Sequence, residues 1–481
     1  MPQSMLQFIH VDRKPPAKRG AKARKGDFDE IYGAYKPSKA GEQASRCSQC
    51  GVPFCQQGCP LSNNIPDWLM LAANGRLEEA YEMSAATKNM PEICGRIGPQ
   101  DRLCEGACVI EQSGHGTVTI GAVEKHLTDT AWKKGWVAPI APIKERPQSV
   151  GIIGAGPGGL AAGEQLRRKG YQVTIYDRYD RGGGLLIYGI PGFKLEKDVV
   201  ARRLKHLEDG GIVFEYNIEI GKDLSFSDLR AKHDTVLIAT GVYKPRALKM
   251  PGVEAEGVLE ALDYLTASNR KSLGDAVPDF ANGKLNAQGK RVVVIGGGDT
   301  AMDCVRTAVR QGAKSVTCLY RRDKANMPGS AREVQNAEEE GVVFEWLAGP
   351  LEVTATNAEK LKAVTAERMK LGAPDASGRQ SPVRTGESFQ VKADSVICAL
   401  GFDPEDLPEL WGERKLTVNR WGAVKVDFAT MMTGLDGVFA AGDIVRGGSL
   451  VVWAIKDGRD AAEAMHKHMM TLASANKVAA E

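Results

Sequence analysis

Long apolar runs are missing from this 481-residue sequence. No stretch reaches the ~18 consecutive apolar residues that a membrane-spanning helix needs, so no membrane span is predicted. Residues 1 to 10 lack the apolar core of a secretory signal, and we therefore expect a cytoplasmic protein. The net charge is only +3. Such a small charge does not favour nucleic acid or a membrane surface as a partner.

The sequence also lacks the pattern of a disulfide framework, although it contains ten cysteines. Seven of them lie at short spacings between Cys47 and Cys108. In a reducing cytosol, this clustering indicates metal ligation rather than disulfide bridges. The other composition values, 43% hydrophobic and 26% charged residues, are ordinary for a soluble globular enzyme.

The first cysteine group has the pattern C-x2-C-x4-C-x3-C-P and comprises Cys47, Cys50, Cys55 and Cys59. Iron–sulfur clusters need closely spaced thiolates on one loop, and the last cysteine of such a run, before a proline, often serves a second cluster. The second group comprises Cys94, Cys104 and Cys108. Structural zinc is the alternative for such cysteines. The x4 gap and the surplus over four ligands favour clusters.

Two stretches around these cysteines carry simpler predictions. Residues 12 to 25 hold seven Lys and Arg side chains among Pro and Gly, and we interpret them as a solvated arm or as an arm that docks on an acidic partner. A helix is predicted after Asn64, with Pro66 and Asp67 in its first turn. Its apolar stripe, interpreted as core, comprises Leu69, Ala73, Leu77 and Tyr81.

The stretch from Val150 to Asp177 carries the most specific motif. A short apolar strand runs into Gly154-x-Gly156-x-x-Gly159, a helix opens there, and a second strand ends on Asp177, 23 positions after Gly154. In this context the glycines allow a tight turn, close approach of a pyrophosphate, and close helix–strand packing, while the acid binds a ribose. A glycine-rich turn without a ligand is the alternative. The intact context favours a dinucleotide site.

Other segments are expected to complete a flavin site. Glycines 182 to 184 and the loop from Tyr188 to Lys194 let the backbone pass close to a planar ring or a phosphate. A buried strand, 235 to 239, ends in Thr240-Gly241, and Asp443 follows a later strand. The predicted flavin-binding residues are Gly154, Gly156, Pro157, Gly158, Gly159, Asp177, Arg178, Gly184, Leu185, Lys194, Thr240, Gly241, Gly442, Asp443, Ser449, Leu450 and Val451.

A second fingerprint, Gly296-x-Gly298-x-x-Ala301, repeats the strand–turn–helix pattern. The strand that follows ends in Tyr320-Arg321-Arg322, where an acid would bind a ribose 2′-hydroxyl. Two guanidinium groups suit a 2′-phosphate instead, so NADP(H) is predicted over NAD(H). A surface arginine pair is the alternative. The predicted nucleotide-binding residues are Gly297, Gly298, Asp299, Thr300, Arg321 and Arg322.

The fold class that follows is α/β, with two Rossmann-like domains of the glutathione-reductase type preceded by an α-helical iron–sulfur domain. Linkers are predicted at 139–148 and 268–290, and residues after about 472 are expected to fray. The resulting domains are 1–145 for [4Fe–4S] clusters, 146–267 together with 402–481 for FAD, and 268–401 for NADPH. A strand over 394–400 should return the chain to the FAD domain.

Two dinucleotide sites and a cysteine-rich region together predict electron transfer. A nicotinamide gives a hydride to a flavin, and clusters accept electrons singly. Because the cofactors carry this chemistry, no side-chain general acid or base is predicted. No Cys-x-x-Cys follows the second fingerprint, which disfavours a thioredoxin-reductase type of enzyme.

These motifs resemble those of the small (β) subunits of bacterial NADPH-dependent glutamate synthases, and they are similar to the N-terminal half of dihydropyrimidine dehydrogenase. The resemblance runs from Cys47 to the helix after Asp443 and includes Gly-Ile-Pro-Gly-Phe-Lys at 189–194 and Ala-Gly-Asp at 441–443. It implies FAD, NADPH, two [4Fe–4S] clusters and a large (α) subunit as partner. In that subunit FMN reduces the 2-iminoglutarate formed from 2-oxoglutarate and glutamine-derived ammonia, so a hetero-oligomer is expected.

The resemblance also implies the cluster ligands. One cluster is expected on Cys47, Cys50, Cys55 and Cys108. The second is expected on Cys59, Cys104, a cysteine of the 94–98 segment, and Glu124. The family pattern places a cysteine at position 98, and this chain has Gly98. Either Cys94 substitutes after a loop shift, or the second cluster is labile, three-ligand or absent, or Gly98 is an engineered or erroneous position.

Two other functions fit the same motifs. One is a reductase subunit that serves another partner, such as a pyrimidine dehydrogenase or a ferredoxin. The other is a non-catalytic assembly module that retains FAD but has lost the electron path because of Gly98.

Overall fold

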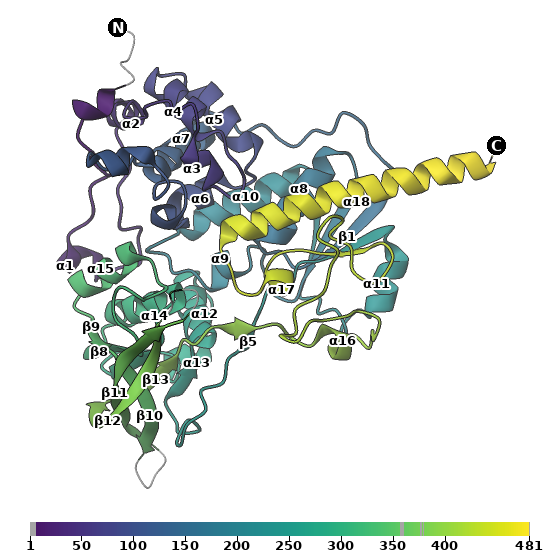
Figure 1. Cartoon of the computed structure of the whole chain (residues 1–481). Helices are drawn as coiled ribbons and strands as arrows, with labels where there is room; N and C mark the ends of the chain where they lie inside the picture. Colours follow the sequence, from purple (N-terminus) through teal and green to yellow (C-terminus); the bar gives the residue numbers. More distant parts are fainter. Residues whose placement is uncertain (1–5, 356–359, 376–377, 379, 481) are drawn as a thin grey trace.

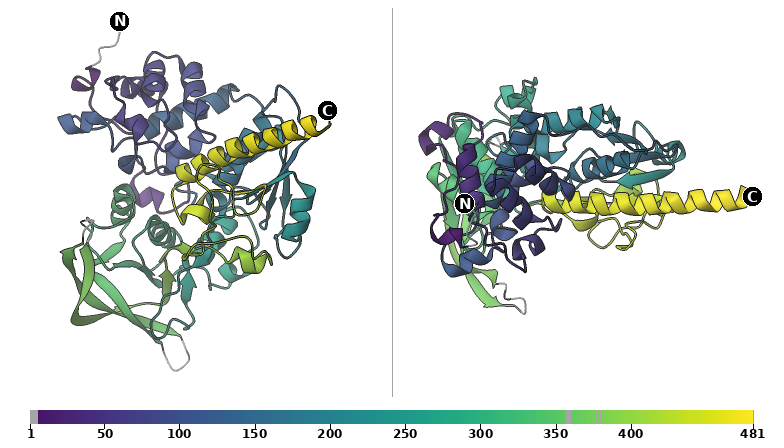
Figure 2. Two further views of the ribbon diagram at one scale, coloured as in Figure 1. Left: turned by 45° about the vertical axis from the view of Figure 1, so that its right-hand side comes forward. Right: turned by 90° about the horizontal axis from the view of Figure 1, so that it is seen from above.

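The computed structural model describes residues 6–355, 360–375, 378 and 380–480. A helical N-terminal part is followed by two regions that are each built on a five-stranded parallel sheet. In Figure 1 the helical part, in purple and blue, lies above the second sheet region, in green. The first sheet region lies at the right, against helix α18 (Val451–Ala480). The turned views in Figure 2 show that the C-terminal end of α18 projects beyond the rest of the chain.

The N-terminal part contains short helices joined by loops that carry the cysteines. The α-helices are α1 (Ala21–Arg24), α2 (Pro37–Ala44), α3 (Phe54–Gln57), α4 (Ile65–Ala73), α5 (Leu77–Ala86), α6 (Pro91–Ile97) and α7 (Ile120–Lys134). Three 3₁₀ helices are η1 (Gln7–Ile9), η2 (Gln100–Arg102) and η3 (Val109–Ser113). Trp68 is fully buried at the centre of the packing, and its indole N–H donates to Asn63 Oδ1 at 2.8 Å.

The helix predicted after Asn64 is confirmed as α4, with Pro66 and Asp67 in its first turn. The apolar stripe predicted from Leu69 to Tyr81 is divided between two helices, α4 and α5. The chain turns at Gly75, which has a φ of +77°, and α5 begins at Leu77. Glycine adopts this left-handed conformation without the Cβ clash that other residues suffer, so Asn74-Gly75 ends one helix and allows the next.

The first sheet has the strand order β15-β4-β1-β2-β3, and all its pairs are parallel. Its strands are β1 (Ser149–Ile153), β2 (Gln172–Asp177), β3 (Val213–Tyr216), β4 (Thr235–Ile238) and β15 (Val438–Ala440). The accompanying helices are α8 (Pro157–Arg168), α9 (Leu185–Tyr188), α10 (Lys197–Asp209), α11 (Phe226–Lys232), α16 (Leu407–Leu410), α17 (Asp443–Arg446) and α18. Because β15 pairs with β4, the chain re-enters this sheet near its C-terminal end.

The second sheet has the order β6-β13-β7-β8-β9 and is also parallel. Its strands are β6 (Val258–Glu260), β7 (Arg291–Ile295), β8 (Ser315–Tyr320), β9 (Val343–Trp346) and β13 (Ser395–Cys398). The helices are α12 (Ala261–Ser272), α13 (Pro278–Ala281), α14 (Asp299–Arg310) and α15 (Ala331–Glu339). An antiparallel sheet adjoins it, formed by β10 (Ala348–Ala355), β11 (Leu361–Pro374) and β12 (Gln380–Lys392).

The two parallel sheets share one plan. In each, the central strand, β1 or β7, runs through a glycine-rich turn into a helix, α8 or α14. The two crossings between the regions pair with each other, because β5 (Lys244–Pro245) is antiparallel to β14 (Phe402–Asp403). The first glycine turn and the first residues of α14 both border the space between the regions. The predicted α/β class with two Rossmann-like sheets behind a helical part is observed.

Two sequence predictions about connections were wrong. The linker expected to start at residue 268 begins later, because α12 continues to Ser272 and Asn269 is buried with its side chain donating to Tyr188 O at 2.9 Å. The first part of this polar stretch is therefore packed helix, in which Ser268 and Asn269 are buried while Lys271 and Ser272 are exposed. The boundary predicted between the FAD and NADPH domains, after residue 267, lies too late in the chain, because strand β6, at 258–260, already belongs to the second sheet.

The fraying expected after residue 472 was also wrong, because α18 continues to Ala480. Alanine, which occupies four of the eight positions from 473 to 480, is the most favourable helix former. The helix packs closely on α8 nearer its start, where a Cβ on Gly458 would lie 2.2 Å from Gly158 O. Within the described part of the chain, no helix combines the length and apolarity needed to cross a membrane.

The basic arm at 12–25 is not simply solvated. Arg24 is 1% exposed, and its Nε donates to Glu340 Oε1 at 2.8 Å. Lys18 Nζ lies 2.6 Å from Glu339 Oε2, at the end of α15. The acidic partner that the charge pattern indicates is therefore part of the same chain, and the arm joins the helical part to the second sheet region. We refer to residues 18–24 and their contacts with Glu339 and Glu340 as the N-terminal clamp.

Candidate functional site

The first glycine turn divides its glycines between packing and open space. Gly154 has a φ of +106°, and a Cβ there would lie 2.4 Å from Ala239 O. A Cβ on Gly159 would lie 2.0 Å from Gly154 O. At Gly156, by contrast, no atom lies within 4 Å of the Cβ position. The outer glycines thus serve the fold, and the middle one leaves room in front of the N-terminus of α8, as a bound pyrophosphate requires.

Asp177 ends β2 beside this turn and is buried, with 8% of its surface exposed. Oδ2 accepts from Ala155 N at 2.7 Å, and Oδ1 accepts from Tyr179 N at 2.9 Å. Burial raises the pKa of Asp177, while these two backbone donors oppose the rise. Each oxygen retains a second lone pair for a ribose hydroxyl. The carboxylate is therefore oriented by the turn that it would help to occupy.

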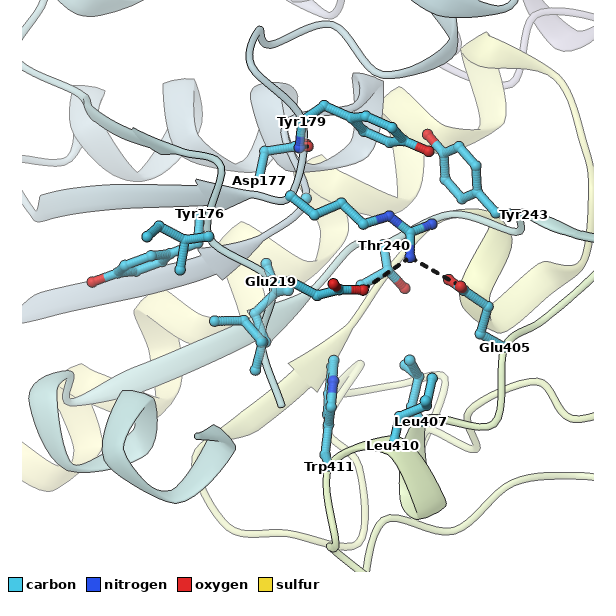
Figure 3. A pocket seen from close by; sticks show the side chains of 15 residues that line it. Tyr176, Asp177, Tyr179, Glu219, Thr240, Tyr243, Glu405, Leu407, Leu410 and Trp411 are labelled. Carbon is cyan, nitrogen blue, oxygen red and sulfur yellow. Dashed lines mark hydrogen bonds and ion pairs between the residues drawn. The ribbon is translucent and has the colours of Figure 1, made fainter. Parts of the chain in front are cut away.

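Arg178 and its surroundings form a pocket beyond Asp177 (Figure 3). Its Nη1 lies 2.9 Å from Glu405 Oε1 and 3.8 Å from Glu219 Oε1, and its guanidinium lies 4.8 Å from the centre of the Tyr243 ring. Figure 3 shows the Tyr179 and Tyr243 rings on one side of the pocket and Trp411 on the other. This pocket has an aromatic wall and a fixed cation, which suits the adenosine end of a dinucleotide.

A larger cavity of about 290 Å³ lies between the two sheet regions and the helical part. Three sets of predicted residues line it. From the first sheet region these are Gly154, Gly156, Pro157, Gly158, Asp177, Leu185, Lys194, Thr240, Gly241, Gly442, Asp443, Ser449, Leu450 and Val451. Asp299 and Thr300 come from the second region, and Cys59, Cys94, Cys104 and Glu124 come from the helical part. We call this space the central cavity.

Several polar groups in the central cavity fit a flavin. The hydroxyl of Thr240 is buried without a hydrogen-bond partner. Asp443 Oδ1 accepts from Ser449 Oγ at 2.7 Å, and burial raises the pKa of Asp443. Leu450 and Val451 lie at the start of α18, whose N-terminal end carries partial positive charge. Gly184, which does not line the cavity, packs on the fingerprint, with its Cβ position 3.0 Å from Gly156 Cα.

The second glycine turn repeats the arrangement of the first. A Cβ on Gly296 would lie 2.3 Å from Ala399 O, and one on Gly297 would lie 2.2 Å from the Tyr320 ring. Gly298 has no atom within 4 Å of its Cβ position, and Ala301 is fully buried in the third place. Gly297 therefore serves packing, and Gly298 is the residue that leaves space for a phosphate.

The two arginines after β8 lie outside the central cavity. Arg321 is exposed, and Arg322 is half-buried with its Nε buried and without a hydrogen-bond partner. A buried guanidinium nitrogen usually has an acceptor, so an unpartnered one indicates a ligand that would supply it. Because Arg322 follows the strand next to β7, it stands at the position of a ribose-binding residue in this type of fold.

The cysteines form two separate groups. Cys47, Cys50, Cys55 and Cys108 line a small cavity with Phe54 and Leu69. Cys59, Cys94 and Cys104 line the central cavity. Burial raises the pKa of Cys47 to about 11 and those of Cys55 and Cys94 to about 12. Thiols in such surroundings release their protons on metal binding. Within the described ranges, no three Cys, His, Asp or Glu side chains converge as they would on a single metal ion.

Glu124 is buried beside the second group. Its Oε1 accepts from Lys88 Nζ at 2.5 Å and from Ser84 Oγ at 3.0 Å. Lys88 is 4% exposed; burial opposes its charge, but the Glu124 carboxylate beside it raises its pKa. Lys88 was not singled out from the sequence, because it lies 36 residues from Glu124 in the chain. The pair places a cation and a carboxylate at the edge of the second cysteine group.

Gly98 lies at the end of α6 and lines the central cavity. Its φ of −59° is open to any residue, but a Cβ there would lie 2.6 Å from Cys94 O. A cysteine at 98 would therefore require a shift of that carbonyl. Cys94, one turn earlier in α6, already lines the same cavity as Cys59, Cys104 and Glu124. Three thiols and one carboxylate thus border the same cavity without residue 98.

Lys194 has a partner that sequence analysis missed. Its Nζ donates to Asp303 Oδ1 at 2.8 Å, which joins the 189–194 loop to α14 across the central cavity. Burial raises the pKa of Asp303 to about 6, and Lys194 opposes the rise. Asp303 lies one helical turn after Asp299, so the helical spacing of α14 was a usable signal. Arg102, Ser330 and Arg332 also line or border this region and were not singled out.

Comparison with known proteins gives two family matches. Residues 24–136 match the family described as dihydropyrimidine dehydrogenase domain II, 4Fe-4S cluster. Residues 148–458 match the pyridine nucleotide-disulphide oxidoreductases. Among solved structures, FprA from Mycobacterium tuberculosis in complex with NADPH has a TM-score of 0.59 at 20% identity, covering 69% of this chain and 86% of FprA. That likeness concerns the fold alone.

Two curated relatives are similar over almost their whole length. The glutamate synthase [NADPH] small chain of Azospirillum brasilense is 62% identical over 474 residues, which are 98% of each protein. The protein of the same name from Escherichia coli K12 is 43% identical over 471 residues, covering 96% of this chain and 98% of the relative.

Proposed function

Because this chain belongs to the family of NADPH-dependent glutamate synthase small chains, we propose that it is the electron-input subunit of such an enzyme. It oxidises NADPH and supplies electrons to a large subunit, where 2-oxoglutarate and glutamine-derived ammonia become glutamate. FAD and [4Fe–4S] clusters, when bound, supply the change from hydride to single-electron chemistry that side chains lack.

The central cavity carries this proposal. It is bordered by the first glycine turn, by Asp299 and Thr300 after the second turn, and by the second cysteine group, so nicotinamide, flavin and one cluster would meet in one space. The protein's own contribution is placement. Gly156 and Gly298 leave room for phosphates, Thr240 and Asp443 offer polar contacts, and the surrounding apolar residues exclude water.

A reconstitution assay tests the function. Purified chain is mixed with a glutamate synthase large subunit, and NADPH oxidation is followed with and without glutamine and 2-oxoglutarate. The expected result is NADPH oxidation that depends on both substrates. Flavin reduction by NADPH without substrate-dependent turnover would favour a reductase for another partner. No flavin reduction at all would favour the assembly module.

Arg322→Ala is expected to raise the KM for NADPH and to leave NADH use almost unchanged. Loss of charge-assisted hydrogen bonds to a 2′-phosphate, worth ~1.5–3 kcal/mol, corresponds to about 10–100-fold in KM. Steady-state kinetics with both coenzymes check this. Arg384→Ala, an exposed arginine on β12 of the same region, is the matched control and should change neither KM. Equal weakening of both coenzymes would make Arg322 structural.

We propose that the large subunit docks at the first cysteine group. Val52 and Phe54 are 55% and 50% exposed, although both are apolar, and they lie between Cys50 and Cys55. Phe54 also lines the small cavity of this group. Electrons leave most readily where a cluster approaches the surface, and exposed aromatic side chains are frequent anchors of protein interfaces.

Phe54→Asp is expected to weaken large-subunit binding by about 30-fold or more, because truncating an interface anchor typically costs at least ~2 kcal/mol. Light scattering or calorimetry measures the affinity, with iron content and NADPH–ferricyanide activity as checks that the chain remains intact. Phe428→Asp, at an aromatic side chain that is 79% exposed elsewhere, is the control. Unchanged affinity in Phe54→Asp would place the interface on another face.

A further inference from the structure

A loop of the helical part reaches the second glycine turn. Helix η2 (Gln100–Arg102) lies between Cys94 and Cys104, and its last residue, Arg102, extends to the second sheet region. Arg102 Nη1 donates to Pro328 O at 2.8 Å, and Nη2 donates to Asp299 Oδ2 at 3.3 Å. These contacts join residues 197 and 226 positions apart in the chain.

Asp299 marks the place where a nucleotide phosphate would lie. It is the first residue of α14 and follows Gly298, whose Cβ position has no atom within 4 Å. Its Oδ1 accepts from Ser330 N at 2.9 Å. An acid at a helix N-terminus suits the helix dipole but repels a phosphate that approaches the same end. A cation on Asp299 is therefore needed if an anion is to bind there.

The connector before α15 closes over the same turn. Gly329 N donates to Gly297 O at 2.9 Å, and a Cβ on Gly329 would lie 3.2 Å from that oxygen. Ser330, next in the chain, is 5% exposed, and its hydroxyl is buried without a hydrogen-bond partner. Ser330 and Thr300 line the central cavity. Because buried hydroxyls are almost always hydrogen-bonded, this one indicates an acceptor that a ligand would supply.

We propose that Arg102 and Ser330 bind the diphosphate of NADPH, so that the cysteine-bearing part completes the nucleotide site. The inference rests on the function proposed above. Arg102 and Asp299 are 42% and 39% exposed in their side chains, so the guanidinium has room to exchange Pro328 O for a phosphate oxygen while it stays beside Asp299. The unpartnered hydroxyl of Ser330, beside Asp299 on the connector before α15, would donate to the same diphosphate. Guanidinium groups are well matched to phosphate oxygens through paired hydrogen bonds.

Arg322 and Arg102 would bind different phosphates of the coenzyme. Arg322 would contact the 2′-phosphate, which only NADPH has, whereas Arg102 would contact the diphosphate, which NADPH and NADH share. Loss of Arg102 must therefore weaken both coenzymes, and loss of Arg322 only one. If Arg102 served only to orient the helical part against the second sheet region, removing another contact between these two parts would weaken coenzyme binding equally.

The test uses the FAD- and iron-loaded chain with ferricyanide as electron acceptor, together with calorimetric titration by NADP⁺. Arg102→Ala is expected to raise both the KM for NADPH and that for NADH by about 10–100-fold, and to weaken NADP⁺ binding equally. Arg102→Lys should recover part of the loss, because it restores the charge without the paired geometry. Ser330→Ala should weaken both coenzymes by about 3–10-fold.

Lys18→Ala is the matched control, because Lys18 also joins the helical part to the second sheet region but lies on the N-terminal clamp. It should leave both KM values within about twofold, since exposed ion pairs contribute little. Unchanged binding in Arg102→Ala, or an equal loss in Lys18→Ala, would overturn the inference while NADPH oxidation by the parent chain stands. If the parent chain neither binds NADP⁺ nor oxidises NADPH, the proposed function fails instead.

Discussion

Replacing Gly156 by valine is expected to give a folded chain without FAD. No atom lies within 4 Å of the Cβ position at Gly156, and its backbone, with φ of −78° and ψ of −179°, suits any residue. The substitution should therefore change the free energy of unfolding of the flavin-free chain by less than about 1 kcal/mol. The new side chain would occupy the space in front of the N-terminus of α8. Overpacking against a pyrophosphate there costs ~3 kcal/mol or more, a loss of affinity above about 100-fold.

Flavin absorbance of the purified protein and FAD titration of the apo chain measure this effect, and urea unfolding measures stability. Gly159→Ala is the informative contrast, because its Cβ would lie 2.0 Å from Gly154 O. That variant should lose stability as well as FAD. If Gly156→Val retained FAD at parental affinity, the pyrophosphate would have to lie elsewhere and the first glycine turn would be structural.

Cys94→Ala is expected to halve the iron content, from about eight to about four atoms per FAD, because one of two [4Fe–4S] clusters would be lost. Cys94 shares the central cavity with Cys59, Cys104 and Glu124, whereas Gly98 offers no side chain to the same space. Thiolate ligands hold such clusters directly, so removal of one of three has a large effect. Iron and sulfide analysis with EPR after reduction, on anaerobically purified complex with the large subunit, provides the measurement.

Two further variants make this result specific. Cys398→Ala removes a buried thiol from β13, away from both cysteine groups, and should keep all the iron. The double variant Cys94→Ala/Gly98→Cys should recover the second cluster if a thiolate from either position of this segment suffices. Full iron in Cys94→Ala would show that this residue is not a ligand. About four irons in the parent chain would show that the second group holds no cluster.

The sequence predicted what is local, and the glycine turns are the clearest case. Gly159 is required by its contact with Gly154 O in the same strand–turn–helix unit, so a short pattern was enough. Gly154 and Gly296 were also found from the pattern, although the atoms that exclude a Cβ there, Ala239 O and Ala399 O, lie far along the chain. The division of cysteines into two groups also followed from spacing and resemblance. Helix α4 began where proline and aspartate predicted.

Features that depend on distant contacts were not predictable. Arg102 looked like one more charge in a cysteine loop, and its position near Asp299 depends on how two regions pack. Lys88 and Asp303 likewise gain their surroundings only from residues far along the chain. The linker prediction failed because the polar segment 268–272 forms the last turn of helix α12, in which Ser268 and Asn269 are buried. Composition alone does not distinguish a polar helix end from a loop.

The two cysteine cavities differ in when they can close during synthesis. All residues lining the small cavity lie between 47 and 120, so its walls are complete once that part has left the ribosome. The central cavity also needs Asp299, Arg332 and the start of α18. The N-terminal clamp spans 316 residues from Arg24 to Glu340, which takes about 15–60 s to synthesise. Iron delivery to the second group therefore has a window that ends when the C-terminal half folds over it, whereas the first group, whose cysteines remain partly exposed, has no such limit.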